Sequence, residues 1–420
     1  MTMIIGRGLT EGYLSRDEIE AIMSDSLEYL ELDGKRVLIV IPDHTRTMPL
    51  PMMFTLFEEL LGQRARYLDY MVALGTHPPL DDDQLSRLVG GQVISGRIGK
   101  TRLINHEWQK SEALTPLGVI PADEIREISA GLLEQPVPVA VNKQIFGYDQ
   151  IILCGPVFPH EVAGFSGGNK YFIPGIAGQE VIDITHWLGA LITSYEVIGK
   201  IDTPVRKVID RAAGLIKVPS ACFGLVVDYK GVAGIYFGEA VPAWKEAAQL
   251  SALRHVIYKP RAYTKVLSIM PEMYDDLWTA AKGMYKLEPV VEDGGEVIIY
   301  APHIHEVSYT HGKLLDEVGY HCRDYFLAQW AQFRDYPWGV LAHSTHVKGQ
   351  GKYDPETRLE TPRIRVTLAT GIPEERCQRI NLGYMDPARI DLHEWEGHED
   401  EGILVVPQAG ETLYRLLGEG

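Results

Sequence analysis

The feature that most constrains the fold is a unit that recurs along the chain: a short β-branched run, a polar loop and a helix-periodic stretch. Its first copy runs from residues 36–41 (R-V-L-I-V-I) through the polar loop 43–46 to a stretch of helical spacing at 52–61. Continuous β-branched runs are typical of strands that are buried on both faces of a parallel sheet. The repetition therefore predicts the α/β class with mainly parallel sheets.

Two further copies bring polar side chains to the ends of strands. Residues 67–74 are predicted to form a strand that ends shortly before His77, and residues 150–154 a strand that leads to His160. In open α/β sheets, ligands bind in the loops at the carboxyl ends of the strands. We therefore expect one site to gather the polar side chains of three strand ends, namely Asp43, Arg46, His77 and His160.

The chain of 420 residues is expected to hold two or three domains, because about 100 to 200 residues make one domain. The pattern breaks near residue 260, so we predict two α/β domains with the active-site cleft between them. The first is predicted to cover residues 1–260 and the second residues 261–394, with the tail (395–420) a candidate to pack back onto the first. The second half is predicted to have strands at 265–270, 295–300, 339–342, 364–368 and 403–406, and helices at 277–286, 312–319 and 411–417.

Composition excludes several classes of protein. A net charge of −17 argues against binding to nucleic acid, which depends on Lys and Arg neutralising phosphates. No apolar run approaches the roughly 20 residues of a membrane helix, and the chain does not open with a secretion signal. The four cysteines form no C-x-x-C pair, so buried reduced thiols are expected rather than a zinc ribbon or a disulfide framework. We expect a cytoplasmic protein without a membrane partner.

A glycine-rich stretch at residues 160–186 is the strongest candidate for a ligand-binding loop, because glycine lets a ligand approach the backbone closely. Its sequence G-F-S-G-G-N-K at 164–170 is similar to a phosphate-binding P-loop. The match fails, because Asn169 replaces the second glycine and Tyr171 replaces the Ser or Thr that binds magnesium. Lys170 could instead act as a nucleophile if burial lowers its pKa.

Each of these residues also has a purely structural interpretation. Asp43 and Arg46 could form an ordinary surface pair, and His77 and His186 could be satisfied histidines of a loop and a helix. No H-E-x-x-H motif or Cys/His cluster is present, so a metal on His186 would need further ligands from a cofactor. Six histidines of the second half stand near Lys282, Arg323 and Trp338, and some are expected to follow strands and face the cleft: His303, His305, His311, His321, His343 and His346.

Taken together, the motifs resemble those of the nickel-dependent lactate racemase family, whose members are 2-hydroxyacid racemases and epimerases. The resemblance rests on an ordered set that extends over nearly the whole chain: D-H-T-R at 43–46, G-T-H at 75–77, P-H at 159–160, G-G-N-K-Y-F-I-P-G at 167–175, and His186.

The resemblance implies a nickel-pincer nucleotide, which is a pyridinium mononucleotide (pyridinium-3,5-bisthiocarboxylic acid mononucleotide) that carries nickel. It would be attached covalently to Lys170, with His186 as the protein ligand of the metal. Asp43, Gly167 and Gly168 would contact the cofactor. Cofactor biosynthesis proteins are then expected as partners.

The resemblance also implies reversible hydride transfer from C2 of a 2-hydroxy acid to the cofactor. His77 and His160 would be the two acid–base catalysts on opposite faces of a planar intermediate, since imidazole titrates near neutral pH. Arg46, Lys282 and Trp338 would bind the substrate. The N-terminal domain (1–260) would then be the cofactor-binding catalytic domain, and the C-terminal domain (261–394) would set substrate specificity.

One departure concerns the substrate. Lactate racemases carry a Tyr-Gln pair shortly before a lysine, whereas this chain has Trp278-Thr279 before Lys282. We therefore expect a longer polar hydroxy acid, such as an aldonate, rather than lactate. The alternatives are another metal- or nicotinamide-dependent hydroxyacid oxidoreductase, for which no G-x-G-x-x-G fingerprint follows a strand, and a noncatalytic protein that carries the cofactor.

Overall fold

The computed structural model describes residues 3–418, and these form two compact units. Unit 1 comprises residues 3–158, 165–182 and 206–254. Unit 2 comprises residues 159–164, 183–205 and 255–418. Each unit is an α/β structure built on a mainly or wholly parallel sheet, so the predicted fold class is confirmed.

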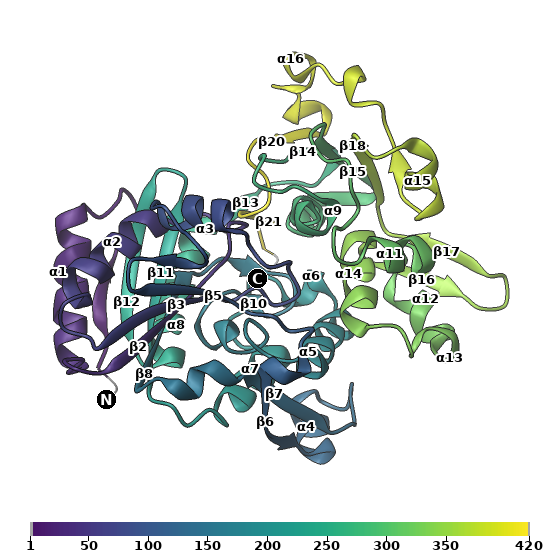
Figure 1. The fold of residues 1–420 in the computed structure, drawn as a ribbon. Helices are drawn as coiled ribbons and strands as arrows, with labels where there is room; N and C mark the ends of the chain where they lie inside the picture. The colour runs from purple at the N-terminus through teal and green to yellow at the C-terminus, as the bar shows by residue number, and fades with distance from the viewer. Residues whose placement is uncertain (1–2, 419–420) are drawn as a thin grey trace. The chain divides into compact units, whose positions relative to one another are not determined.

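Unit 1 contains an eight-stranded sheet in the order β1-β12-β11-β8-β2-β3-β5-β4. The central pairs are parallel, and the pairs at both edges are antiparallel. Its sheet strands are β1 (Ile5–Gly8), β2 (Arg36–Ile41), β3 (Tyr67–Val72), β4 (Arg97–Ile98), β5 (Thr101–Asn105), β8 (Gln150–Pro156), β11 (Ser220–Asp228) and β12 (Gly231–Gly238). The strands predicted at 36–41, 67–74 and 150–154 are therefore present, and Figure 1 shows β2, β3 and β8 within this sheet.

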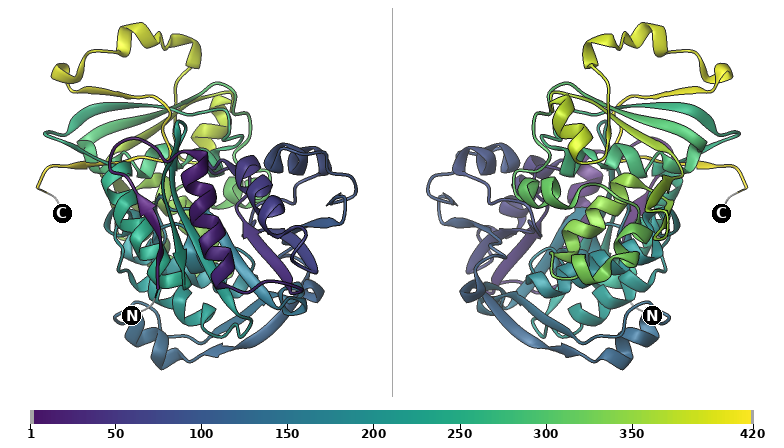
Figure 2. Two further views of the ribbon diagram at one scale, coloured as in Figure 1. Left: turned by 90° about the vertical axis from the view of Figure 1, so that its left-hand side faces the viewer. Right: turned by 90° about the vertical axis from the view of Figure 1, so that its right-hand side faces the viewer.

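The helices of unit 1 include α1 (Arg16–Tyr29), α2 (Leu50–Leu61), α3 (Asp82–Val89), α4 (Ala122–Ile128), most of α7 (Pro204–Ala213) and nearly all of α8 (Ala240–His255). A separate two-stranded antiparallel sheet is formed by β6 (Leu114–Ile120) and β7 (Val137–Asn142). Helix α1 begins with a capping box, in which Ser15 and Glu18 satisfy each other's backbone amides. Figure 2 shows this helix running alongside the strands.

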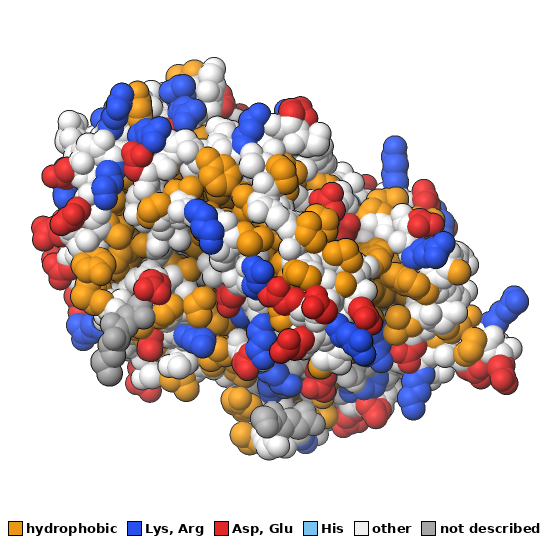
Figure 3. Space-filling view, turned by 90° about the horizontal axis from the view of Figure 1, so that it is seen from below, with side chains coloured by type: hydrophobic (Ala, Val, Ile, Leu, Met, Phe, Trp, Pro, Cys, Tyr) orange, Lys and Arg blue, Asp and Glu red, His pale blue; other side chains and the backbone are white. Residues whose placement is uncertain are grey.

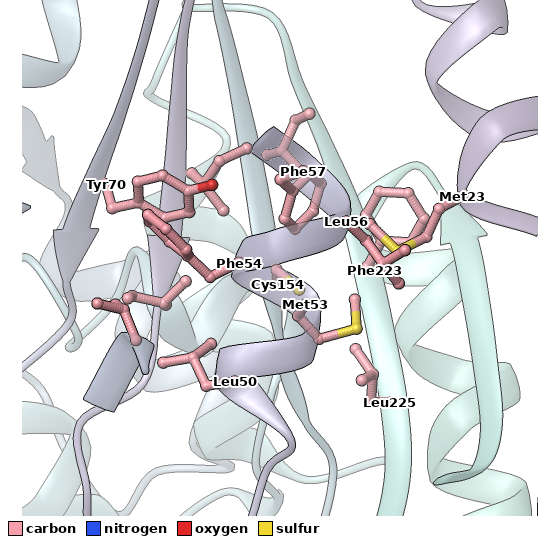
Figure 4. Close-up of a cluster of buried hydrophobic side chains, with 14 of the residues drawn as sticks. Met23, Leu50, Met53, Phe54, Leu56, Phe57, Tyr70, Cys154, Phe223 and Leu225 are labelled. Atoms are coloured by element: carbon pink, nitrogen blue, oxygen red, sulfur yellow. The ribbon is translucent and has the colours of Figure 1, made fainter. Parts of the chain in front are cut away.

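The hydrophobic core of unit 1 fills the space between α1, α2 and one face of the sheet. Phe54 of α2 packs on Tyr70 of β3 with ring centroids 4.8 Å apart, and Phe57 packs edge-on against Phe223 of β11 at 5.8 Å (Figure 4). The opposite face of the sheet is covered in part by α8, because a Cβ at Gly224 would lie 3.0 Å from the Cβ of Ala247. With both faces covered, the strands must be apolar throughout, which explains the continuous β-branched runs.

Unit 2 contains a five-stranded parallel sheet in the order β19-β18-β15-β14-β20. Its elements include β9 (Pro159–His160), most of α5 (Gln179–Ile192), α6 (Ser194–Val197), β13 (Val256–Lys259), β14 (Tyr263–Ile269), α9 (Leu277–Ala280), α10 (Lys282–Tyr285), β15 (Val291–Ala301), α11 (Gly312–Val318), α12 (Arg323–Ala328), α13 (Trp330–Phe333), α14 (Trp338–Lys348), β16 (Gly351–Asp354), β17 (Leu359–Pro362), β18 (Arg365–Thr370), α15 (Glu374–Arg379), β19 (Gly383–Tyr384), α16 (Leu392–Trp395), β20 (Ile403–Val406) and β21 (Leu413–Leu416).

Two predicted elements of unit 2 are wrong. Residues 339–342, predicted as a strand, belong to helix α14, in which residues 339–347 are all buried. A helix that is buried on every side need not show a 3.6-residue pattern, so the short apolar run at its start cannot be told from a buried strand. Residues 411–417, predicted as a helix, contain strand β21, which pairs with β13.

The division into units differs in detail from the predicted domains. The main segment of unit 2 starts at His255, close to the predicted boundary at 260. Unit 2 also contains residues 159–164 and 183–205, which were predicted to belong to the N-terminal domain. The tail lies in unit 2, where β20 joins the five-stranded sheet and β21 pairs with β13. The predicted helix at 277–286 is present as two short helices, α9 and α10.

Candidate functional site

Asp43 and His77 meet at the carboxyl edge of the unit 1 sheet. Strand β2 ends at Ile41 and the parallel β3 ends at Val72, so the loops that follow them leave the same edge side by side. The Nδ1 atom of His77 and the Oδ2 atom of Asp43 are hydrogen-bond partners. The structure thus brings together two of the side chains that were predicted at strand ends.

Asp43 is held as a carboxylate although it is only 5% exposed. Its Oδ1 atom accepts hydrogen bonds from the amide of Thr45 at 3.0 Å and from the hydroxyl of Thr45 at 2.7 Å. Burial alone would raise the pKa of Asp43, but His77, and then Arg46 and Thr45, hold that pKa well below its usual range. An ionised Asp43 accepts the proton on Nδ1 of His77, which leaves the lone pair of the neutral ring on Nε2.

Arg46 lies close enough to this pair for its charge to lower the pKa of Asp43. The side chain is half-buried, and its Nη1 atom donates to the carbonyl and the hydroxyl oxygens of Thr45, both at 3.2 Å. A guanidinium group can bind a carboxylate through two parallel hydrogen bonds. The predicted contact between Arg46 and a substrate stays a prediction.

The glycine-rich loop needs glycine for its own packing. Gly167 and Gly168 have φ angles of +81° and +59°, where other residues are strained. A Cβ at Gly167 would also lie 2.7 Å from Val157, and a Cβ at Gly168 would lie 2.9 Å from Trp244. The predicted contact of these glycines with a cofactor stays a prediction, because the protein itself already requires them.

Lys170 lies in the 3₁₀ turn η3 (Gly168–Tyr171) of this loop, and its side chain is half-buried. The Lys170 amide donates to Gly167 at 3.2 Å, and its carbonyl accepts from Gly175 at 3.0 Å. The carbonyl of Gly175 in turn accepts from the amide of Gly75 at 2.9 Å. This bond ties the loop of Lys170 to the loop that carries His77.

A buried arginine supports the same loop, and sequence reasoning missed it. Arg206 of α7 is 3% exposed and donates to the carbonyls of Gly167, at 3.2 Å, and of Phe165. Its guanidinium lies 4.0 Å from the ring centroid of Trp244, whose indole donates to the carbonyl of Ser166 at 2.8 Å. Burial lowers the pKa of Arg206 to about 10. The sequence around Arg206 and Trp244 contains no motif that points to a role in this loop. Their contacts with the loop join segments that are far apart in the sequence, so only the structure shows them.

His160 lies in unit 2, at the end of the two-residue strand β9, and is 7% exposed. Its Nδ1 atom accepts a hydrogen bond from the amide of Val162 at 3.1 Å, which places the proton of a neutral ring on Nε2. The carboxylate of Glu161 also lies 3.2 Å from Nδ1. These two contacts belong to two states, since Nδ1 cannot accept from Val162 and donate to Glu161 at the same time.

His186 lies in the part of α5 that belongs to unit 2, and it is half-buried. Burial lowers the pKa of His343 in the same unit, and His186 is one of the neighbouring histidines that lower it further. Within residues 3–418, no three or more His, Cys, Asp or Glu side chains are grouped so as to hold a metal ion. A metal bound at His186 would therefore need most of its ligands from another molecule.

Trp278 forms an aromatic layer with two histidines in unit 2. Its ring stacks on His343 with centroids 4.0 Å apart and contacts His311 at 4.6 Å. Burial, followed by the neighbouring histidines, holds the pKa of His343 well below its usual range, so His343 is neutral at pH 7. The departure at Trp278 that was noted in the sequence therefore lies in a histidine-rich part of unit 2.

The two other predicted substrate contacts have structural neighbours. The ammonium of Lys282 lies 4.4 Å from the ring centroid of Tyr274. Trp338 packs with Trp187 and Trp330, and its indole donates to the carbonyl of Arg334 at 2.9 Å. Their contacts with a substrate stay predictions.

The remaining histidines of the second half do not share one environment. His303 follows strand β15, as predicted, and its Nε2 atom lies 3.0 Å from the carbonyl oxygen of Tyr274. His343 and His346 do not follow a strand, because both belong to helix α14. His321 instead pairs with Glu360 at 2.8 Å.

A model of one protein family matches the first half of the chain. The family is described as the lactate racemase N-terminal domain, and the match covers residues 16–199. Two curated lactate racemases are each 24% identical to the chain: one from Thermoanaerobacterium thermosaccharolyticum over 281 residues (66% of this chain and 62% of the relative), and one from Lactiplantibacillus plantarum over 298 residues (67% and 63%). The chain thus spans less than two thirds of the length of these relatives.

Two solved structures are similar over nearly the whole chain. A protein from Thermotoga maritima is 35% identical, with a TM-score of 0.89 over 96% of this chain and 98% of that one. The lactate racemase apoprotein from Thermoanaerobacterium thermosaccharolyticum is 18% identical, with a TM-score of 0.72 over 97% and 95%, and this likeness concerns the fold alone. None of the helices in the described residues is both long and apolar enough to cross a membrane.

Proposed function

Because the chain belongs to the lactate racemase family, we propose that it is a racemase or epimerase that inverts C2 of a 2-hydroxy acid. The observation that carries the proposal is the buried carboxylate of Asp43 on Nδ1 of His77, at the carboxyl edge of a parallel sheet. Sheet edges of this kind are where α/β enzymes bind their ligands.

His77 is suited to remove a proton from the 2-hydroxyl group. Asp43 holds the Nδ1 proton, so the lone pair of His77 is on Nε2. The carboxylate also stabilises the imidazolium that forms when Nε2 takes up the hydroxyl proton. A well-placed base of this kind contributes about 10²- to 10⁴-fold to a rate.

His160 is suited to the complementary step. As an imidazolium, His160 would keep its Nδ1 proton toward Glu161, 3.2 Å away, and give its Nε2 proton to the carbonyl oxygen of a 2-keto acid. The ring is then neutral, and in the reverse reaction Nε2 takes up the proton of the 2-hydroxyl group and the ring becomes charged again. Glu161 stabilises this charged form, as Asp43 does for His77.

Two cations would hold the substrate carboxylate. Arg46 would bind it through its guanidinium fork, and Lys282 would act as a single charge. Both side chains are held by neighbours, Thr45 for Arg46 and the ring of Tyr274 for Lys282, so little freedom is lost when an anion binds.

Lys170 and His186 fit the nickel-pincer nucleotide that the sequence resemblance implies. The donor set supports this, because His186 stands without a cluster of metal-binding side chains in the described residues and the cofactor would supply the missing ligands. Lys170, on its supported loop, would be the covalent anchor. When bound, the cofactor would supply the acceptor for the C2 hydrogen, and the chain would bind, orient and protonate the substrate.

The substrate is proposed to be a longer polar hydroxy acid, such as an aldonate. Trp278 with the neutral His343 and with His311 offers ring nitrogens that can hydrogen-bond to hydroxyl groups. Lactate has only a methyl group beyond C2, so it has no further hydroxyl group that could bond to these ring nitrogens.

The cofactor is tested on protein produced together with the cofactor's biosynthetic enzymes. We expect intact-mass analysis to show an adduct that Lys170→Ala lacks and that the control Lys200→Ala, at an exposed pair with Glu196, retains. We expect nickel to be lost in His186→Ala and kept in His393→Ala. An unmodified wild-type mass would rule out the covalent cofactor.

The activity is tested by incubating loaded protein with a panel of 2-hydroxy acids and aldonates in deuterated water and with C2-deuterated substrates. Inversion at C2 supports the racemase. Net oxidation with a soluble nicotinamide would indicate an oxidoreductase instead. Loaded protein that inverts no member of the panel would favour a carrier of the cofactor.

A further inference from the structure

Unit 1 has a cavity at the edge of the sheet opposite to Asp43 and His77. It has a volume of about 460 Å³, within the range of small-molecule sites, and its wall includes Arg36, Arg97, Lys100, Arg102, Tyr67 and Tyr148. Arg36 and Tyr67 are the first residues of the parallel strands β2 and β3. A strand of six residues is roughly 20 Å long, so this cavity is separate from the loops at the carboxyl edge.

The cavity concentrates positive charge in an acidic chain. On the face drawn in Figure 3, acidic and basic side chains are interspersed. Here, in contrast, Arg97 of β4 and Arg102 of β5 are direct partners across an antiparallel pair, and Lys100 stands in the turn between them. Like charges directly opposite each other destabilise a strand pair. Such an arrangement is favourable when an anion lies between the two side chains.

Part of the cavity wall is already rigid. Arg102 donates to Asp69, and its Nη2 atom donates at 2.7 Å to the hydroxyl of Tyr148, which itself donates to Asp69 at 2.8 Å. Asp69 is 3% exposed and Tyr148 is 7% exposed. This buried network holds the guanidinium of Arg102 in one orientation, so its Nη1 atom, which has no hydrogen-bond partner among the described residues, is available to a ligand.

Arg97 and Lys100 are the two cations of the cavity wall for which no ion pair is found within the described residues, although Lys100 lies near enough to Glu58 to oppose the rise in the pKa of Glu58 that burial causes. Asp69 neutralises Arg102, and Asp149 neutralises Arg36 through a bidentate contact at 2.7 and 3.1 Å. The guanidinium of Arg97 has no hydrogen bond or ion pair with any residue in the described part of the chain. Lys100 donates to the carbonyl of Gly62 at 2.6 Å and keeps its charge and its other two protons.

We propose that this cavity binds a small phosphorylated molecule. Two cations without an ion pair, Arg97 and Lys100, suit the charge of a phosphate group, and the planar guanidinium forks suit its tetrahedral oxygens. Tyr67, which is 50% exposed, offers an aromatic face for the organic part of the ligand. The net charge of −17 argues against a long polyanion such as nucleic acid, which a cavity of this size would also not enclose.

The test is calorimetric titration of the full-length protein with pyrophosphate, the simplest probe of this class, with citrate as a carboxylate of similar charge. We expect saturable binding of pyrophosphate that weakens as salt rises from about 50 to 200 mM. Arg97→Gln and Lys100→Gln should each weaken it about tenfold, the loss expected for one charge-assisted contact. Lys230→Gln, in the exposed turn after β11, is the matched control and should bind as the wild type does.

Each outcome decides the proposal. Equal binding of citrate would make the site one for general anions and overturn the phosphate assignment. Absence of saturable binding at about 10 mM pyrophosphate, or equal weakening in Lys230→Gln, would overturn the site itself. Circular dichroism of every variant checks the fold, and Arg97→Lys, which keeps the charge, should retain most of the binding. None of these measurements depends on the proposed racemase activity.

Discussion

Replacing Asp43 by asparagine tests whether its carboxylate sets the protonation of His77. In the wild type, Oδ1 accepts from both donors of Thr45 while Oδ2 faces Nδ1 of His77. An asparagine side chain that keeps its oxygen toward Thr45 presents its amide protons to His77. Nδ1 of His77 must then accept, and the ring proton moves to Nε2, where the base is needed.

The alternative orientation of the introduced side-chain amide is also costly. If the asparagine oxygen turned toward His77, its NH₂ group would face the backbone N–H of Thr45, and two donors cannot bond to each other. The buried N–H of Thr45 would then be unsatisfied, which costs about 1–3 kcal/mol. That penalty corresponds to a population of roughly 1 in 5 to 1 in 150 for the active arrangement. With loss of the stabilising charge as well, we expect kcat to fall about 10²- to 10⁴-fold.

Two measurements check this prediction. Chiral analysis of product gives kcat for the loaded enzyme, and nitrogen-15 NMR of histidine-labelled protein without cofactor reports which ring nitrogen of His77 carries the proton. The control is Asp149→Asn, the same chemical change at a partly exposed ion pair with Arg36. A ring of His77 that stays protonated on Nδ1 in Asp43→Asn, or a kcat within about threefold of the wild type, would refute the reasoning.

Three further predictions follow from other contacts. Arg206→Met should lower the free energy of unfolding by about 3–5 kcal/mol in urea titrations, because it leaves two buried carbonyls without a donor. The control Arg16→Met, at an exposed ion pair, should lower it by less than about 1 kcal/mol. Trp278→Ala should raise KM for the preferred substrate more than it lowers kcat, since it removes a wall and no acid or base; the reverse pattern in steady-state kinetics would contradict this. Burial would raise the pKa of Glu360, but His321 and the amide of Cys322 lower that pKa from 4.5 to about 2. Glu360 therefore stabilises the fold above pH 4.5, by at most about 3 kcal/mol, and this contribution is lost as pH falls from 4.5 through about 2. Glu360→Gln should therefore be destabilising in urea at pH 7 and nearly neutral at pH 2; an equal effect at both would exclude this linkage.

The sequence predicted the parts of the fold that depend on local pattern. Residues 37–41 and 68–72 are buried within the sheet, and the continuous β-branched and leucine run at 36–41 carries a clear signal of such a strand. The same signal failed at residues 339–342, because the first turn of a helix buried on every side can also be a short apolar run. It failed at residues 411–417 because pairing with β13, far away in sequence, overrides the local preference of a short segment.

The sequence by itself determined which chemical groups stand at the ends of the strands, because parallel strands with covered faces direct their following loops to one edge. It named Asp43 and His77 without showing that they touch. Only the tertiary structure decided that contact, the opposite hydrogen bonding at Nδ1 of His160, and the support of the Lys170 loop by Arg206. These hydrogen bonds join residues that are distant along the chain, so no local sequence pattern can predict them. The alternation of strands and helices, in contrast, depends on the spacing of apolar residues among near neighbours, and the sequence alone can predict it.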